Sequence, residues 1–433
     1  MTEPVTIPVA HPAPRRPHVV IIGGGFAGLQ AARALRNAPV QVTLLDRTNH
    51  HLFQPLLYQV ATASLSPGDI IAPIRWVLRR QQNTFVMLGE VSGIDVVSRT
   101  ISLAGSGRAL TYDYLVLAPG GRHSYFAHPE WETLAPGLKS VEDAAELRRR
   151  FLLSFERAEL CEDEAERTAY QTIVIVGGGP TGVELAGAIP DIAYKALRRD
   201  FRRIDTRRTR VILLEGGDRV LPAFPPDLSA RAKRDLESLG VEVRLNSLVT
   251  EVHGDRVGVG EETIRTHTVF WAAGNVISPL TALLGAPLDR AGRVLVEPDL
   301  SIPGHPEVFV IGDAAHVVCG GRVVPGVAPA AMQQGRSAGR NIARSLAGNA
   351  RVPFDYFNKG DVATIGRHKA VADFGRFRMT GRFAWWLWLT IHIMYLIGFR
   401  NRLTVLIEWA YAYFTYQRGV RLITGATRAS DSG

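Results

Sequence analysis

The sequence predicts an α/β fold built from two similar strand–turn–helix units and followed by amphipathic helices at the C-terminus. Three observations predict it. An apolar β-branched run, a glycine cluster and a helical pattern follow one another from residue 18, and the same succession returns from residue 172. Strands and helices then keep alternating, as parallel sheets covered by helices require. Past residue 360 an apolar, aromatic and basic segment replaces this alternation.

The composition is that of an ordinary globular protein. Its 433 residues are 46% hydrophobic and 21% charged, which excludes disordered, collagen-like and coiled-coil proteins and allows about three folding units. The two cysteines, Cys161 and Cys319, are too few and too far apart for a disulfide scaffold or a CxxC motif, and this fits a reducing compartment. Residues 1–17 are rich in proline and contain no apolar run of signal-peptide length, so we expect a disordered lead there.

The elements follow from hydrophobic periodicity and from the residues that end each run. β-Branched runs predict strands at 18–22, 40–46, 85–91, 112–118, 172–176, 210–215, 241–252, 268–272 and 307–313. Helical spacing of apolar residues predicts helices after each glycine cluster, a charged connector helix at 142–168, and helices at 227–239 and 329–347.

The first glycine cluster, HVVIIGGGFAG, fits the fingerprint of a dinucleotide-binding turn. In GxGxxG the first glycine allows the turn, the second lets a pyrophosphate approach, and the third lets the helix pack on the strand. The pyrophosphate then lies on the helix N-terminus, and an acid that ends the next strand binds the adenosine ribose. We therefore expect this nucleotide on Gly23, Gly25, Phe26, Ala27, Gly28, Asp46 and Arg47.

The second cluster, TIVIVGGGPTG, repeats the fingerprint, and two fingerprints in one chain indicate a flavin and a nicotinamide nucleotide. Glu215 ends the following strand, and its carboxylate favours NADH because it would repel the 2′-phosphate of NADPH; the nearby Arg219 weakens that preference. VFWAAG ends a further strand at Gly274. The expected nicotinamide-nucleotide residues are Gly177, Gly179, Pro180, Thr181, Gly182, Glu215 and Gly274.

Two more strands end in glycine where a cofactor is expected. YDYLVLAPG brings a turn at Gly120, and EVFVIGD ends in Gly312 and Asp313, an acid suited to a polyol hydroxyl. An N-cap of the following helix is the structural alternative for Asp313.

The net charge of +9 is concentrated at the C-terminus. Residues 366–428 contain ten basic and two acidic side chains, so the rest of the chain is close to neutral. Eleven aromatic residues lie within 383–416, and the apolar run 383–399 is at the lower limit for a membrane span. We predict two interfacial helices on an anionic membrane surface. A membrane hairpin and a soluble helix pair or dimer interface remain alternatives. Nucleic acid is disfavoured because the basic residues lie among Trp and Ile with no recognised binding fold.

Several stretches resemble the type II NADH dehydrogenases, the single-subunit NADH:quinone oxidoreductases of the two-dinucleotide-binding-domain flavoproteins. They are NHHLFQPLLYQVAT, GVELAG, VPGVAPAAMQQGR, ATIGR, GFRNR and YFTYQRG. The resemblance implies FAD in the first domain, an inserted NADH domain and a quinone reached from the membrane side. NADH would pass hydride to the flavin, and two electrons would then reach ubiquinone or menaquinone without proton pumping.

The resemblance also implies an organisation and a location. We expect a lead at 1–17, an FAD-binding domain at 18–140 and 291–350, an NADH-binding domain with the connector helix at 141–290, and a C-terminal membrane-docking module at 351–433. A homodimer held peripherally on the cytoplasmic face of the cell inner membrane is expected.

A few polar side chains are candidates for the chemistry. Glu184, on the first turn after the second fingerprint, is the candidate to relay a proton to the quinone, or it is an acid stabilised by the helix dipole. Gln333 and Gln334 are candidates for flavin or quinone carbonyls, or a helix start. Tyr58 and Gln59 are expected to line the flavin and quinone pocket, or to pack there. No metal cluster is expected.

The sequence departs from the family pattern at two points. Pro329 stands where relatives often have the first glutamine of AQxAxQ, which removes a quinone contact at 329 and leaves Gln333 as the match. Ala118-Pro119-Gly120 replaces the usual ATG, which costs a hydroxyl donor and keeps the turn.

Two other functions are weighed. A sulfide:quinone oxidoreductase would share the fold and would use reactive cysteines such as Cys161 and Cys319. The intact second fingerprint with Glu215 speaks against it. A membrane-docked, redox-responsive binding flavoprotein is the alternative outside the enzymes.

Overall fold

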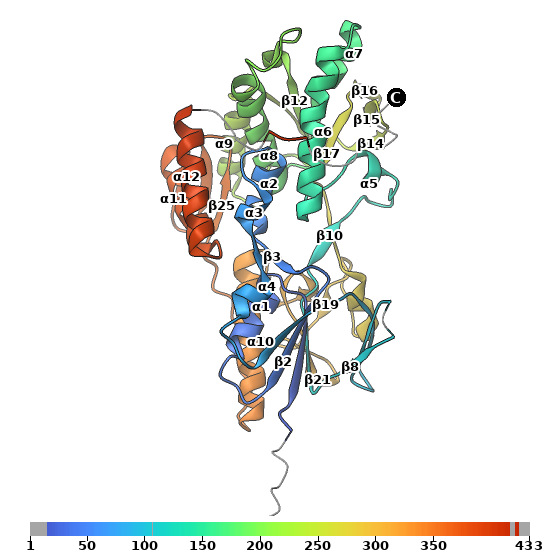
Figure 1. Cartoon of the computed structure of the whole chain (residues 1–433), viewed down its shortest axis with the longest axis vertical. Helices are drawn as coiled ribbons and strands as arrows, with labels where there is room; N and C mark the ends of the chain where they lie inside the picture. Colours follow the sequence, from blue (N-terminus) through green and yellow to red (C-terminus); the bar gives the residue numbers. More distant parts are fainter. Residues whose placement is uncertain (1–14, 106, 416–420, 424–433) are drawn as a thin grey trace, which may run out of the picture. The chain divides into compact units, whose positions relative to one another are not determined.

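The computed structural model describes residues 15–105, 107–415 and 421–423, and the chain forms two compact units (Figure 1). The first unit consists of Met1–Asn49, Leu78–Gly120 and Ser278–Tyr356, and the second of His50–Val77, Gly121–Ile277 and Phe357–Gly433. Residues 1–14 of the predicted lead lie outside the described residues. The predicted domain boundaries at 140, 290 and 350 stay a prediction.

A six-stranded sheet is the centre of the first unit, in the order β20-β21-β9-β1-β2-β5. All neighbours are parallel except β20 and β21. The inner strands are runs of buried Val, Ile and Leu, as expected for a parallel sheet that is covered on both faces. The strands are β1 (His18–Ile22), β2 (Gln41–Asp46), β5 (Thr84–Leu88), β9 (Tyr114–Leu117), β20 (Ser301–Ile302) and β21 (His305–Val310).

Two helices of the first unit cross closely. A Cβ on Gly335 of α10 (Ala328–Leu346) would lie 2.1 Å from the carbonyl oxygen of Ala27 in α1 (Phe26–Ala34), and one on Gly339 would lie 2.8 Å from that of Ala31. Glycine at these positions therefore lets α10 pack directly on the helix of the first glycine turn.

Small sheets and 3-10 turns complete the first unit. They are the antiparallel sheet β6 (Val91–Asp95), β7 (Thr100–Leu103) and β8 (Ala109–Thr111), the parallel pair β19 (Val294–Leu295) and β22 (Ala315–His316), the hairpin β23 (Val318–Cys319) and β24 (Arg322–Val323), and the turns η4 (Pro279–Leu284) and η5 (Gly312–Ala314).

The second unit repeats the Rossmann-like arrangement around a four-stranded parallel sheet of order β13-β12-β11-β17. Beside it, Trp271 packs with Tyr125 and Trp131 in one apolar core. The sheet consists of β11 (Thr172–Val176), β12 (Arg210–Leu214), β13 (Val241–Arg244) and β17 (Thr268–Trp271); an antiparallel sheet adds β14 (Val249–Val252), β15 (Arg256–Val259) and β16 (Glu262–Arg265), and β10 (Gly121–His123) pairs with β18 (Asn275–Ile277).

The helices of the second unit differ from expectation at two places. The connector predicted as one helix at 142–168 is two helices, because Asp163 caps a new helix by accepting from the Ala165 N–H. Pro190 lies in the last turn of α8, and the helix continues as the π-turn η2. The helices are α5 (Trp131–Leu134), α6 (Val141–Leu160), α7 (Glu164–Tyr170), α8 (Pro180–Asp191), η2 (Ile192–Ala196), η3 (Thr206–Arg208) and α9 (Pro226–Glu237).

The segment His50–Val77 folds into short elements within the second unit. β3 pairs with β4 in antiparallel register, and α2 packs against α6 and α8. The elements are β3 (His50–Leu52), η1 (Gln54–Leu56), α2 (Leu57–Ala61), α3 (Pro67–Ile70), β4 (Ile71–Pro73) and α4 (Ile74–Leu78).

The C-terminal part of the second unit is a three-stranded antiparallel sheet with two helices beside it, drawn in red in Figure 1. Two side chains of α11 are buried. Ala384 packs against the sheet, and Trp388 is only 2% exposed. The helix break comes at Gly398, whose φ of +93° is left-handed, and Arg400 and Arg402 lie in the second helix instead of separating the two. The elements are β25 (Asp361–Thr364), β26 (Ala370–Asp373), β27 (Arg378–Thr380), α11 (Gly381–Tyr395) and α12 (Phe399–Thr415).

Within the described part of the chain, no helix combines the length and apolar character needed to cross a membrane.

Candidate active site

The first and third glycines of both turns are required by the backbone. Gly23 and Gly177 have φ values of +103° and +107°, in the left-handed region. A Cβ on Gly28 would lie 1.9 Å from the carbonyl oxygen of Gly23, and one on Gly182 would lie 1.8 Å from that of Gly177. The tight turn and the close helix packing therefore explain these four residues without a ligand.

The second glycines are different. A Cβ on Gly25 or Gly179 would meet no protein atom within 4 Å. Each precedes the first turn of a helix, Phe26 and Ala27 in α1 and Pro180 and Thr181 in α8, and neither caps it through a side chain. Protein packing does not require glycine at these two positions, whereas a pyrophosphate against the helix N-terminus does. The residues present thus fit a dinucleotide at each turn.

Asp46 and Glu215 are held against their own glycine turns in the same way. Asp46 Oδ2 accepts from the Gly24 N–H at 2.5 Å, and Glu215 Oε2 accepts from the Gly178 N–H at 2.5 Å. The other oxygen of Glu215 accepts from the Gly217 N–H at 2.7 Å, while Arg47 is exposed beside Asp46. Gly24 and Gly178 were not predicted as part of the turns, although the middle glycine of each GGG run was the available signal.

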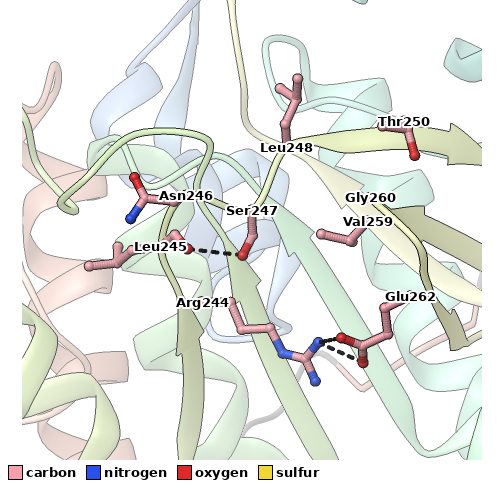
Figure 2. A pocket seen from close by; sticks show the side chains of 9 residues that line it. All are labelled: Arg244, Leu245, Asn246, Ser247, Leu248, Thr250, Val259, Gly260 and Glu262. Atoms are coloured by element: carbon pink, nitrogen blue, oxygen red, sulfur yellow. Dashed lines mark hydrogen bonds and ion pairs between the residues drawn. The ribbon is translucent and has the colours of Figure 1, made fainter.

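A cavity of about 580 Å³ opens beside the loop that follows β13 (Figure 2). The Ser247 N–H donates to the backbone carbonyl of Glu215 at 2.8 Å, so this loop adjoins the acid. On one side Arg244 donates to both carboxylate oxygens of Glu262 at 2.8 Å. The lining residues were not predicted, and they are Arg244, Leu245, Asn246, Ser247, Leu248, Thr250, Val259, Gly260 and Glu262.

Three further predicted glycines adopt positive φ. Gly120 has a φ of +67° and open space at its Cβ position, as Gly25 and Gly179 have. Gly274 has a φ of +72°, and a Cβ there would lie 2.9 Å from the Ser124 Cβ, so packing alone requires glycine at 274. Gly312 has a φ of +73°.

The turn at Gly312 is fixed by a buried glutamine. The Gly312 N–H donates to Gln334 Oε1 at 2.6 Å, which makes this amide oxygen part of the turn. Asp313 caps no helix, because Ile311 precedes η5 and Val327 precedes α10. Gln333 Nε2 donates to the Pro329 carbonyl at 3.2 Å, the position where the family glutamine is replaced.

Tyr58 and Gln59 are tied to the C-terminal helices. Trp409 Nε1 donates to Gln59 Oε1 at 2.7 Å, and Gln59 Nε2 donates to the Tyr58 hydroxyl at 2.9 Å. All three belong to the second unit, and both Tyr58 and Gln59 are buried. Gln59 therefore links α12 to the tyrosine across 350 residues of sequence.

Glu184 lies on α8 where this helix packs against β25. The packing is close, since a Cβ on Gly187 would lie 2.4 Å from the Gly366 nitrogen. Glu184 is half-buried as a residue, but burial of its carboxyl group raises its pKa to about 8, and the opposing hydrogen bond from the Thr364 N–H is the smaller effect. The group is therefore protonated at neutral pH and can give up a proton.

The two cysteines are free and half-buried. Cys161 Sγ donates to the Asp163 carbonyl and Cys319 Sγ to the Phe354 carbonyl, each at 3.4 Å. Among the described residues no group of His, Cys, Asp and Glu could hold a metal ion.

Comparison with known proteins gives the family. The model of the pyridine nucleotide-disulphide oxidoreductases matches residues 17–335, and that of the NDH2 C-terminal domain matches residues 358–416. The type II NADH:quinone oxidoreductases NdhA and Ndh of Mycobacterium tuberculosis are 47% and 45% identical to this chain, over 94% and 98% of it and 90% and 93% of their own lengths. The chain belongs to the type II NADH:quinone oxidoreductases.

Solved structures confirm the fold of this type II oxidoreductase. NDH2 from Plasmodium falciparum in complex with NADH aligns over 95% of this chain and 100% of its own, with a TM-score of 0.85 and 20% identity. The sulfide:quinone oxidoreductase of Aquifex aeolicus aligns over 92% and 95%, with a TM-score of 0.70 and 18% identity. The fold is thus shared with the sulfide enzyme, and the family is given by the 47% and 45% identity to the Mycobacterium tuberculosis enzymes.

Membership of the family confirms several predictions: the α/β class with two Rossmann-like domains and C-terminal helices, the enzyme class, and FAD and NADH as cofactors. The roles of the individual site residues stay predictions.

Proposed function

We propose that this type II oxidoreductase oxidises NADH and reduces a membrane quinone, ubiquinone or menaquinone, through bound FAD and without pumping protons. When bound, FAD accepts a hydride from NADH and passes two electrons to the quinone, which takes up two protons to become the quinol. The open Cβ positions of Gly25 and Gly179 carry the proposal at the level of the site, because they leave room for two dinucleotides.

A stopped-flow experiment tests this function. Purified, flavin-loaded protein is mixed with NADH, and then with ubiquinone and menaquinone analogues. We expect bleaching of the flavin absorbance by NADH and its return with at least one quinone. If NADH bleached the flavin and no quinone restored its absorbance, quinone reduction would be excluded and the binding flavoprotein would remain as the alternative.

The chain's own residues bind and orient the two nucleotides. We propose that Gly23, Gly25 and Gly28 receive the FAD pyrophosphate, with Asp46 on the ribose and Asp313 on a polyol hydroxyl. The second turn receives NADH, with Glu215 on its adenosine ribose. The cavity beside Glu215, lined by Asn246 and Ser247 among others, then suits the adenine.

Replacing Glu215 with glutamine should raise the kcat/KM for NADPH relative to NADH by about tenfold, because a charge that repels the 2′-phosphate is lost. Initial rates with the two nucleotides measure it. Glu251→Gln, an equal charge change on an exposed residue of the same unit, should leave the ratio as it is. An unchanged ratio in Glu215→Gln would remove Glu215 from the ribose site.

At the quinone end we propose Tyr58, Gln59 and Gln333 as pocket residues and Glu184 as the proton relay. Since Gln59 uses its oxygen on Trp409 and its nitrogen on Tyr58, it acts by holding the tyrosine. Gln334 acts in the same indirect way through Gly312.

We further propose that α11 and α12 dock on the cytoplasmic face of the cell inner membrane, and that the enzyme is a homodimer. The exposed apolar side chains of these helices support docking: Phe383 is 78% exposed and Trp386 is 55% exposed. Aromatic residues of this kind are favoured at the membrane interface.

The double substitution Phe383→Ser and Trp386→Ser should weaken binding to lipid vesicles by about 10- to 100-fold, because two exposed apolar side chains no longer enter the interface. Co-sedimentation measures binding, and NADH oxidation by a soluble acceptor should be unchanged. Phe85→Ser, a similarly exposed phenylalanine of the first unit, is the control. Equal binding of all three proteins would contradict docking through α11. This pair avoids removing Trp388, which is buried.

A further inference from the structure

A second basic segment lies outside the C-terminal helices. Residues 195–210, which join η2 to β12, contain eight basic and two acidic side chains. The chain outside residues 366–428 is close to neutral. Because this basic segment belongs to that part of the chain, its other residues carry a net negative charge.

Its backbone is held by an acid, and its arginine side chains stay exposed. The N–H groups of Arg202, Arg203 and Ile204 donate to the Glu159 carboxylate at 2.9, 2.9 and 3.0 Å. This carboxylate fixes the loop through backbone groups. The exposed arginines are Arg198, Arg199, Arg202, Arg203, Arg207, Arg208 and Arg210.

The arginines divide into two groups. Arg207, Arg208 and Arg210 each meet a carboxylate, of Asp205 at 2.7 Å, of Glu164 at 3.0 Å and of Glu242 at 3.1 Å. In contrast, the ion pairs among the described residues include none with Arg198, Arg199 or Arg203. The other acid of the segment, Asp200, is already paired with Arg421.

The start of this basic segment adjoins the C-terminal part of the second unit. Arg421 contacts Asp200 and also donates to the Ala196 carbonyl at 3.1 Å. On the other side, the His368 ring lies 5.4 Å from that of Trp385 in α11. Burial lowers the pKa of His368, and Arg367, Arg382 and Lys195 lower it further, while Asp191, the partner of Lys195, opposes them. These charged groups therefore lie around His368.

We propose that Arg198, Arg199 and Arg203 extend the membrane-docking surface from α11 onto the NADH-binding unit by binding the phosphates of anionic phospholipids. This inference rests on the proposed docking of the C-terminal helices. Exposed cations on this segment and exposed aromatic side chains on α11 would match the two layers of a bilayer interface, the headgroup phosphates and the acyl boundary. Arg207, Arg208 and Arg210 of the same loop are less suited, because each already donates to a carboxylate and would have to give up that contact to bind a phosphate.

The test compares vesicles of phosphatidylglycerol and phosphatidylcholine with vesicles of phosphatidylcholine alone. The triple variant Arg198→Gln, Arg199→Gln, Arg203→Gln should bind the anionic vesicles at least about tenfold more weakly than wild type in low salt. The difference should shrink as salt is raised, because screening weakens exposed charges. The matched control is Arg207→Gln, Arg208→Gln, Arg210→Gln, which removes the same charge from the same loop and should bind like wild type.

The outcomes separate this inference from the function it rests on. Equal loss in both triple variants would mean that only net charge matters, and equal wild-type binding to both vesicle types would mean that no anionic headgroup is used; either overturns the inference. Loss of binding in Phe383→Ser, Trp386→Ser with none in the Arg198 triple variant also overturns it, while docking through α11 stands. NADH oxidation by a soluble quinone analogue should be normal in every variant. A wild-type protein that binds anionic vesicles but does not oxidise NADH would instead count against the proposed function.

Discussion

Replacing Gly179 with valine should raise the KM for NADH by about 100-fold or more, while flavin content and melting temperature stay at wild-type values. The new side chain would meet no protein atom within 4 Å of its Cβ, so the fold has room for it. A pyrophosphate seated on the α8 N-terminus does not have that room. Steady-state kinetics, the flavin absorbance ratio and a thermal melt measure the three quantities.

Two other glycines of the same unit provide controls. Gly254→Val also points into open space, and it should change neither KM nor stability. Gly182→Val should fail by destabilisation, because its Cβ would lie 1.8 Å from the Gly177 carbonyl oxygen. If Gly179→Val bound NADH normally, the second turn would not be the nucleotide site.

The two glycine turns could be predicted from the sequence because everything they need is local. Gly23 and Gly28 are five residues apart, and their spacing alone requires the turn and the helix contact that the structure shows. Asp46 and Glu215 could be predicted in the same way, because each comes at the end of the strand next to its turn. Local geometry of this kind depends on few residues, and a single sequence contains it.

Contacts between distant segments could not be predicted in the same way. Gln59 was expected to line a pocket, and nothing near it in the sequence indicates that Trp409 will occupy its oxygen. The helix break at Gly398 was missed because the apolar pattern continues past it. Arg208 and Arg210 pair with Glu164 and Glu242, which are distant in the sequence, so counting charges could not distinguish these two arginines from Arg198 and its neighbours.

For Glu184, the position in the chain could be predicted from the local sequence, whereas the protonation state could not. The glycine fingerprint predicted it on the first helical turn, and this suggested either a role in proton transfer or an acid stabilised by the helix dipole. In the structure α8 begins at Pro180, so Glu184 lies just past the first turn. Its protonation state depends on the distant strand β25, whose packing buries the carboxyl group and raises its pKa to about 8. An ionised acid at the helix N-terminus would instead have a lowered pKa.

Replacing Glu184 with glutamine should therefore affect the two half-reactions differently. Flavin reduction by NADH should keep its rate, because glutamine has the shape and charge of the protonated acid. Flavin reoxidation by a quinone analogue should slow by about 10²- to 10⁴-fold, the usual contribution of a proton-transferring group. In wild type the reoxidation rate should also change around pH 8, and this change should be absent in the variant. Stopped-flow absorbance resolves both steps, and Glu261→Gln, an exposed acid of the same unit, is the control.

Stability against pH gives a readout that is independent of catalysis. Because the folded protein keeps the proton to a higher pH than the unfolded chain, the folded state binds more protons between about pH 4.5 and pH 8, and its stability falls as pH rises through this window. Glu184→Gln has no proton to lose, so its melting temperature should fall less than that of wild type between pH 5 and pH 8. Parallel melting curves would show that the carboxyl group is not buried as the structure has it. If the two melting curves differ with pH but the variant reoxidises its flavin at the normal rate, Glu184 is a buried acid with no part in proton transfer. Only different melting curves together with slow reoxidation support the relay.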